Sequence, residues 1–108
     1  MAQHSPACGA QDIGTEWNSA REEQAKFVSV LLEPQRIKII RLLRGGELCV
    51  CEIERSLGIP QNLVSHHLRV LREAGLVTAR KEGQFVHYSR AEERIHELML
   101  TLEELLSN

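Results

Sequence analysis

The sequence has few aromatic residues and no long apolar run. Its aromatic side chains are only Trp17, Phe27, Phe85 and Tyr88, so we expect a core built from Leu, Val and Ile. The apolar runs are short and interrupted by charged residues, which excludes a membrane-spanning helix. No basic region followed by an apolar stretch stands near the N-terminus, so we expect no secretory signal and a cytoplasmic protein.

The usual signatures of small enzymes are also missing. The chain has no glycine-rich phosphate loop, no spacing typical of a catalytic triad and no redox Cys-x-x-Cys motif. With 108 residues, 43% hydrophobic and 26% charged, it has the size and composition of one globular domain. We therefore expect a single-domain binding protein and not an enzyme.

The net charge of −2 argues against a protein that is basic all over, but the charges are unevenly distributed. Residues 60–90 carry more Lys and Arg than Glu, whereas residues 91–108 carry Arg94 as their only Lys or Arg among several Glu. A basic middle and an acidic end predict two surfaces with different partners.

The spacing of apolar residues predicts four helices, a β-hairpin and a last helix. Residues 1–14 lack any period and are predicted to be a flexible arm, with one domain over residues 15–108. We expect helices over 15–32, 34–45, 48–57 and 60–74, strands over 76–80 and 84–89, and a last helix after residue 89. Ser19 to Glu22 and Ser89 to Glu92 each fit a capping box. The order predicts a mainly α, winged helix-turn-helix fold.

The fourth predicted helix has one apolar and one polar face. Its first two turns carry outward polar residues that can bond base edges or phosphates: Gln61, Asn62, Ser65, His66 and Arg69. Gln and Asn side chains pair with adenine and Arg pairs with guanine. The same pattern is also typical of any solvated helix face, so the periodicity alone leaves both readings open. His67 lies nearer the apolar side, where we expect it to pack.

The predicted hairpin carries a second group of DNA-binding candidates. Arg80, Lys81 and Gln84 flank Gly83, and such residues on a wing can bind phosphates or enter a minor groove.

Cys49 and Cys51 form a Cys-x-Cys pair at the start of the third predicted helix. Thiolates select soft ions. In an ideal helix the two side chains would diverge by about 200°, so a shared ion requires an irregular helix start. The alternatives are two small buried side chains or a redox pair that senses oxidants or reactive sulfur.

Two runs of residues resemble the ArsR/SmtB family of repressors. Residues 59–77 are similar to the recognition helix and first wing strand of that family, and residues 33–43 are similar to its second helix. One departure is Pro60, where many relatives carry Ser. The resemblance implies a homodimer formed by the first and last helices, bound to double-stranded operator DNA at an inverted repeat.

Residues 47–52 are similar to the inducer-binding box of the metal-sensing and arsenic-sensing members of this family. This resemblance implies a repressor that is released by a soft ion, with arsenite or antimonite first and Cd, Pb or Zn as the alternatives. Glu54 replaces the further Cys that completes the site in one group. In a second group, the N-terminal arm of the partner subunit supplies further cysteines, and this resemblance makes Cys8 in the arm a candidate third ligand, with His4 as a weaker one. His96 stands alone on the last helix, so we expect no zinc site there.

Overall fold

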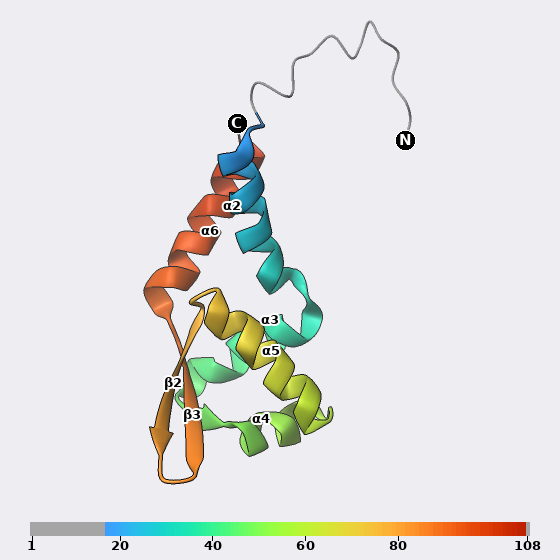
Figure 1. The fold of residues 1–108 in the computed structure, drawn as a ribbon, viewed down its shortest axis with the longest axis vertical. Coiled ribbons are helices and arrows are strands. Elements are labelled where there is room, and N and C mark those ends of the chain that lie inside the picture. The colour runs from blue at the N-terminus through green and yellow to red at the C-terminus, as the bar shows by residue number, and fades with distance from the viewer. Residues whose placement is uncertain (1–16, 108) are drawn as a thin grey trace, which may run out of the picture.

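The computed structural model describes residues 17–107 and confirms the predicted winged helix-turn-helix class (Figure 1). The predicted flexible arm over residues 1–14 lies outside the described residues. In chain order the elements are α2 (Ser19–Ser29), the 3-10 turn η2 (Val30–Leu32), α3 (Pro34–Leu42), the 3-10 turn η3 (Leu43–Gly45), β1 (Leu48–Cys49), α4 (Val50–Leu57), α5 (Gln61–Glu73), β2 (Val77–Glu82), β3 (Phe85–Arg90) and α6 (Glu92–Ser107). Within residues 17–107, no helix is long and apolar enough to cross a membrane.

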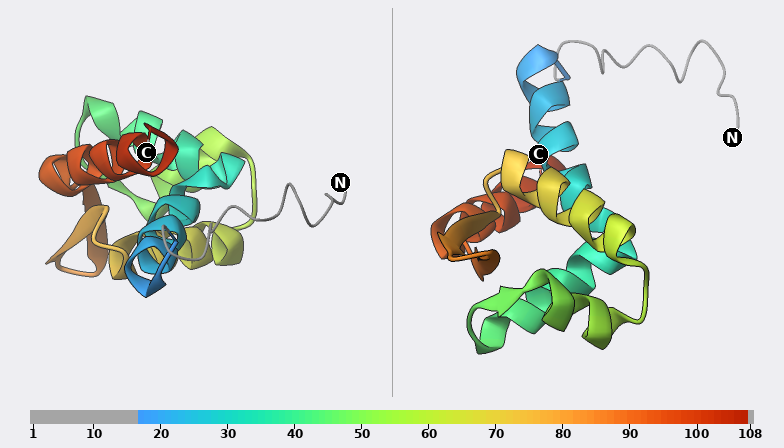
Figure 2. Two further views of the ribbon diagram at one scale, coloured as in Figure 1. Left: turned by 90° about the horizontal axis from the view of Figure 1, so that it is seen from above. Right: turned by 60° about the horizontal axis from the view of Figure 1, so that its bottom comes forward.

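The first and last described helices, α2 and α6, pack side by side at one end of the molecule (Figure 1). Helices α3, α4 and α5 and the hairpin of β2 and β3 make up the other end. Figure 2 shows α4 leading through a short turn into α5. Gly58 ends α4 in the left-handed conformation, with φ of 69°, which glycine adopts without steric cost.

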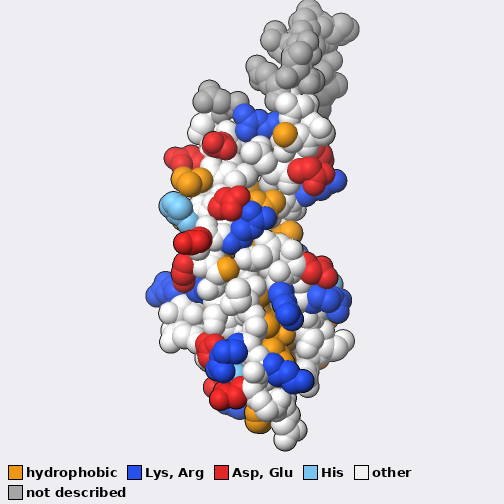
Figure 3. Space-filling model, turned by 60° about the vertical axis from the view of Figure 1, so that its left-hand side comes forward, with side chains coloured by type: hydrophobic (Ala, Val, Ile, Leu, Met, Phe, Trp, Pro, Cys, Tyr) orange, Lys and Arg blue, Asp and Glu red, His pale blue; other side chains and the backbone are white. Residues whose placement is uncertain are grey.

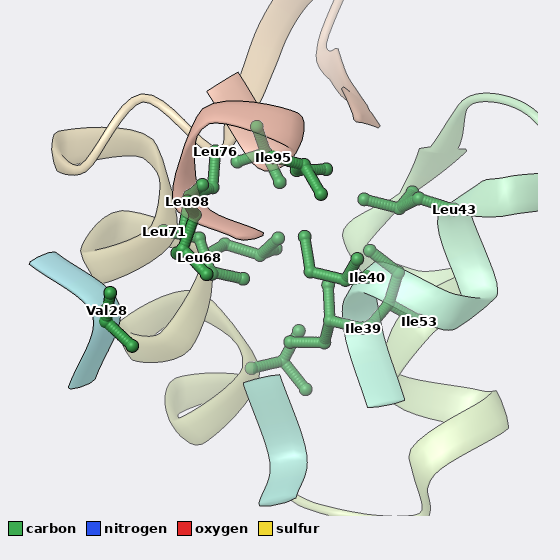
Figure 4. Close-up of a cluster of buried hydrophobic side chains, with 12 residues drawn as sticks. Val28, Ile39, Ile40, Leu43, Ile53, Leu68, Leu71, Leu76, Ile95 and Leu98 are labelled. Atoms are coloured by element: carbon green, nitrogen blue, oxygen red, sulfur yellow. The ribbon is translucent and has the colours of Figure 1, made fainter. Parts of the chain in front are cut away.

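The core is aliphatic, as the scarcity of aromatic residues predicted. Every fully buried apolar side chain among the described residues is Val, Ile or Leu. Figure 4 shows the core side chains of α3, α5 and α6 converging, with Ile53 of α4 joining them. Leu68 in the middle of α5 has no exposed surface. Helix α5 is thus fixed by its apolar face, which leaves its opposite face free for other contacts.

The sheet has a third strand that the sequence did not predict. β1 pairs with β3 in antiparallel register, Leu48 opposite Tyr88 and Cys49 opposite His87, which gives the strand order β1-β3-β2. The prediction of a helix from residue 48 was therefore wrong, and α4 begins at Val50. The reason is that backbone pairing with β3 satisfies the amide groups of these residues in place of a helical turn.

Both predicted capping boxes were wrong. Asn18 caps α2, because its side-chain oxygen accepts a hydrogen bond from the Arg21 amide at 3.0 Å. Ser89 lies in β3, and its hydroxyl donates to Glu47 instead. Helix α2 also ends at Ser29, three residues earlier than predicted, and continues as η2. Asn is as good an N-cap as Ser, so sequence alone does not choose between neighbouring Asn18 and Ser19.

Candidate thiol site and nucleic-acid interface

The two cysteines of the Cys-x-Cys pair lie in direct contact. Their Sγ atoms are 2.8 Å apart, with Cys49 partly buried and Cys51 exposed. Cys49 is the last residue of β1 and the N-cap of α4, with extended φ and ψ of −89° and 168°. Because Cys49 is extended and Cys51 is helical, the side chains converge where a continuous helix would separate them. The irregular helix start that a shared ion requires is thus present.

A hydrogen bond to Glu52 holds the backbone at Cys49 in place. The Glu52 carboxylate accepts a hydrogen bond from the Cys49 amide at 2.8 Å, and this bond lowers the pKa of Glu52. The contact with Cys51 raises the pKa of the Cys49 thiol above its usual value. Among residues 17–107, no group of three or more His, Cys, Asp or Glu side chains is placed to hold a metal ion. The described residues therefore offer two sulfurs to a soft ion.

The thiol pair is connected to both predicted DNA-binding elements, directly to the hairpin and through α4 to α5. Cys49 is opposite His87 in β3, and β3 pairs with β2 to form the hairpin, which we call the wing. Cys51 lies in the first turn of α4, which leads into α5 through Gly58. One strand thus connects the sulfurs to the wing, and one helix connects them to α5.

Helix α5 presents all five predicted DNA-binding residues to solvent. Gln61, Asn62, Ser65, His66 and Arg69 are each exposed, whereas Val64, Leu68 and Leu71 on the opposite face are buried. His66 Nδ1 lies 3.3 Å from the Arg69 guanidinium, so these two side chains support each other. An exposed polar face near the N-terminus of a helix is what recognition helices present to base edges.

The wing carries the other three predicted DNA-binding residues, with small changes in their positions. Lys81 belongs to β2 and not to the turn, and β3 begins one residue after Gln84. Gly83 takes φ of 62° in the turn, a conformation that favours glycine. Arg80, Lys81 and Gln84 are all exposed. The face drawn in Figure 3 shows acidic and basic side chains side by side.

Arg80 makes an ion pair that the sequence did not reveal. Its guanidinium donates two hydrogen bonds to the Glu47 carboxylate at 2.7 and 3.0 Å and one to Glu82 at 3.4 Å. The hydrogen bond to Arg80 lowers the pKa of Glu47, and Glu47 in turn raises the pKa of Arg80. Glu47 directly precedes Leu48, so this ion pair joins the start of β1 to the wing.

His67 packs as expected, beside two charged residues from an earlier part of the chain, Glu33 and Arg36. The Arg36 guanidinium lies 3.0 Å from His67 Nδ1, and His67 Nε2 lies 3.8 Å from Glu33. Because Arg36 can only donate, Nδ1 must accept and the ring proton must be on Nε2. Burial is the main cause that lowers the pKa of His67, with Arg36 and His66 adding to it and Glu33 opposing it. The neutral imidazole fits this place in the fold.

Two of the predicted ligands, Cys8 and His4, fall among residues 1–16, outside the described residues. Their roles remain predictions from the resemblance.

Comparison with known proteins connects this fold to one family. Residues 33–79 match the family model described as bacterial regulatory protein, arsR family. The chain is 39% identical over 85 residues to an uncharacterized HTH-type transcriptional regulator of Methanocaldococcus jannaschii, covering 78% of this chain and 96% of that protein. It is 45% identical over 64 residues to the arsenical resistance operon repressor of Escherichia coli, covering 58% of this chain and 55% of that protein.

A solved structure supports the same assignment. The crystal structure of a possible transcriptional regulator for arsenical resistance superposes with a TM-score of 0.72 and 33% identity, covering 76% of this chain and 85% of that one. The matched residues 33–79 span α3 to β2, which includes the thiol pair and the recognition helix. On its sequence and its fold, this chain belongs to the ArsR family of transcriptional regulators, which bind DNA and are not enzymes.

Proposed function

We propose that the chain is a cytoplasmic repressor whose homodimer binds an inverted repeat in operator DNA and leaves it on capturing arsenite or antimonite. The observation that carries this proposal is the contact between the Cys49 and Cys51 sulfurs at a junction that joins the wing to the helix before α5. A soft ligand at these sulfurs acts on both elements at once. The likeness to a repressor of arsenical resistance supports arsenic first, with Cd, Pb or Zn as the alternatives.

On the DNA side, α5 lies in the major groove and the wing contacts the backbone or the minor groove. Gln61, Asn62, Ser65, His66 and Arg69 reach base edges or phosphates, because they share the exposed face of α5. Arg80, Lys81 and Gln84 serve the wing in the same way. Two-fold symmetry places the two recognition helices about 34–36 Å apart, one DNA turn.

The homodimer is supported by the apolar surface that α6 leaves uncovered in one chain. Met99, Leu100 and Leu106 have exposed fractions of 60%, 49% and 78%. These side chains lie on α6, the helix that packs against α2 at the end of the molecule opposite the tip of the wing (Figure 1). A second copy of the chain that covers them buries apolar surface which water would otherwise contact.

Capture of an ion changes the distance between the sulfurs. In a zinc site, thiolate bonds of about 2.3 Å at a tetrahedral angle hold two sulfurs roughly 3.8 Å apart. The narrower pyramidal angle at trivalent arsenic brings two sulfurs closer than that, but not as close as the 2.8 Å found here. The sulfurs must therefore move apart on binding, by up to about 1 Å. Cys49 is paired with β3 and Cys51 is in α4, so this separation shifts the wing relative to α5 and lowers the affinity for DNA.

The experiment is an arsenite titration followed by ultraviolet thiolate absorption, with DNA release measured in parallel by fluorescence anisotropy. The operator probe is a duplex selected from a random pool by the protein without arsenite. We expect Cys49→Ser/Cys51→Ser to abolish both binding and release, and Cys8→Ser to weaken binding. If the paired variant still releases DNA on arsenite addition, the pair is not the sensor.

The contact between the sulfurs also supports a second candidate, a redox switch of the same fold. Oxidation of the pair to a disulfide removes two hydrogen atoms, so mass spectrometry after mild oxidation detects it as a loss of about two mass units. Release of DNA by peroxide or polysulfide but not by arsenite, together with that mass loss, favours the redox switch. Release by arsenite with the thiols still reduced favours the ion sensor.

A further inference from the structure

The side chain of Arg94, in the first turn of α6, contacts three helices of the fold. Its Nε donates a hydrogen bond at 3.1 Å to the carbonyl oxygen of Ala74, the C-cap residue of α5. Its guanidinium carbon lies 4.0 Å from the centre of the Phe27 ring of α2. Within α6, an ion pair at 2.9 Å joins it to Glu97. Arg94 therefore stands where α2, the end of α5 and the start of α6 meet (Figure 1).

Each of these contacts suits a guanidinium group. The last carbonyl groups of a helix have no partner within the helix and form the negative end of its dipole, so a cation stabilises the end of α5. The face of an aromatic ring also attracts a cation. A planar guanidinium can stack on the ring of Phe27 and donate to Ala74 at the same time, whereas the ammonium group of a lysine is a single point charge.

Gly75, the residue after Ala74, lets Arg94 lie close to the end of α5. Gly75 has φ of 80°, in the left-handed region that favours glycine. A Cβ atom at this position would lie 3.4 Å from Nε and 3.5 Å from Cγ of Arg94. The stem of Arg94 thus packs on the same turn whose carbonyl oxygen its Nε bonds.

The angle between α5 and α6 decides which DNA sites the proposed homodimer can bind. Helix α6 carries the apolar surface assigned to the dimer, and α5 carries the residues assigned to base edges. With 13 residues, α5 is about 20 Å long. A rotation of about 10° around its C-terminal end moves its N-terminal residues by roughly 3 Å, close to the step of about 3.4 Å between base pairs.

Apolar packing alone does not fix this angle. Ile95 and Leu98 of α6 lie in the core, but the burial of apolar surface is non-directional. The hydrogen bond to Ala74 is directional, and so is the stacking on Phe27, because it needs the face of the ring. Arg94 is also the only Lys or Arg in residues 91–108, so no other basic side chain of α6 can replace it.

We propose that Arg94 is a positioning residue that sets the angle between α5 and α6, and thereby the distance between half-sites that the homodimer accepts. This inference rests on the proposed function, because it requires a dimer bound to an inverted repeat. Arg94 acts through α5 and not by contact with DNA, since it is bonded to the C-terminal end of α5 and the base-reading residues begin at the other end, with Gln61.

The test measures the affinity of the full chain for three labelled duplexes by fluorescence anisotropy. The first carries the inverted repeat that the wild type selects, the second has one base pair inserted between its half-sites, and the third carries a single half-site. Arg94→Met keeps an unbranched side chain without the guanidinium, and Arg94→Lys keeps the charge. Lys26→Met is the matched control, because it removes a positive charge from α2 that contacts Glu23 of the same helix. Urea denaturation checks folding, and size-exclusion chromatography checks the dimer.

We expect the inserted base pair to weaken wild-type binding at least tenfold. Arg94→Met binds the selected repeat about tenfold more weakly, which is the order of one charge-assisted hydrogen bond, but tolerates the inserted base pair with a loss of about twofold or less. Its affinity for the single half-site is unchanged. Arg94→Lys falls between the two, and Lys26→Met equals the wild type.

Phe27→Leu tests the same contact from the other side, and does so even if Arg94→Met fails to fold. It removes the ring beneath the guanidinium and keeps an apolar side chain on α2. We expect it to change the three affinities in the same direction as Arg94→Met. Combined with Arg94→Met it costs no further affinity, because the contact between the two residues is already lost.

Three results overturn the inference and leave the proposed function standing. The first is a wild-type penalty for the inserted base pair in both Arg94→Met and Phe27→Leu. The second is a monomeric Arg94→Met, or an equal loss of affinity for all three duplexes. The third is a slope of log affinity against log salt that is shallower by about 1.8 in Arg94→Met, because Arg94 then contacts a phosphate on each protomer. A wild-type chain that binds the repeat no better than the single half-site refutes the dimeric repressor as well.

Discussion

The ion pair between Glu47 and Arg80 predicts how the wing contributes to the salt dependence of DNA binding. Lys81 is exposed and makes no ion pair with any described residue, whereas Arg80 is held by Glu47 and Glu82. A lysine that neutralises one phosphate contributes about 0.9 to the slope of log affinity against log salt. In a homodimer, Lys81→Ala therefore makes this negative slope shallower by about 1.8.

Substitution of Glu47 is expected to change the salt dependence in the opposite direction. Glu47→Gln removes the carboxylate that occupies Arg80, so the guanidinium becomes available to a phosphate on each protomer. We expect the slope to steepen by up to about 1.8, which is roughly a tenfold larger loss of affinity between 50 and 200 mM salt. Arg80→Ala lowers the slope by less than Lys81→Ala does, because Arg80 already has a carboxylate partner.

Fluorescence anisotropy of a labelled duplex, repeated at several salt concentrations, measures these slopes. Glu103→Gln is the matched control, since it removes the same charge from an exposed position on α6, far from the wing. Its slope is expected to equal that of the wild type. Equal changes of the slope in Glu47→Gln and Glu103→Gln, or an unchanged slope in Lys81→Ala, contradict these roles of Glu47 and Lys81.

Three further predictions concern α5. Arg69→Ala is expected to cost about 1–3 kcal/mol of specific binding free energy and to relax the base preference at one position per half-site. A binding selection on randomised duplexes measures both effects. An equal loss of affinity for all sequences contradicts a base contact. Leu68→Ala lowers the free energy of unfolding by about 2–5 kcal/mol, because the side chain has no exposed surface; urea denaturation tests this, and a cost below 1 kcal/mol contradicts the packing. Folding lowers the pKa of His67, which lies beside Glu33, Arg36 and His66. Between the folded-state pKa and about pH 6.5, the unfolded chain therefore binds more protons at this histidine than the folded chain does. The free energy of unfolding falls as the pH drops through this range. His67→Gln flattens that part of the curve of stability against pH, and an unchanged curve rules this histidine out as its source.

The helices and the wing were predictable because each is long enough for its period to show. Leu68 and Leu71 repeat at helical spacing, and Gly58 and Gly75 stand where the chain must turn. β1 has two residues, too few for any period, and it exists only because Leu48 and Cys49 pair with Tyr88 and His87 about 40 residues later. Such long-range pairing leaves no local trace in the sequence.

In the candidate site, too, the local patterns were predictable and the long-range contacts were not. Spacing singled out Cys49 and Cys51, and the polar face of α5 follows from helical periodicity. The hydrogen bonds that join Glu47 to Arg80 connect residues 33 positions apart. Phe85 lines one hollow together with Cys49 and Cys51 only because β1 adds to the sheet. Contacts that depend on the register of a third strand require the folded structure.

The most direct test of the account is the affinity for arsenite measured with and without bound operator duplex, at one salt concentration and one pH. If arsenite lowers the affinity for DNA, DNA must lower the affinity for arsenite by the same factor. We expect arsenite to bind the DNA complex about 5- to 150-fold more weakly than it binds the free protein. Equal affinities in the two titrations contradict it.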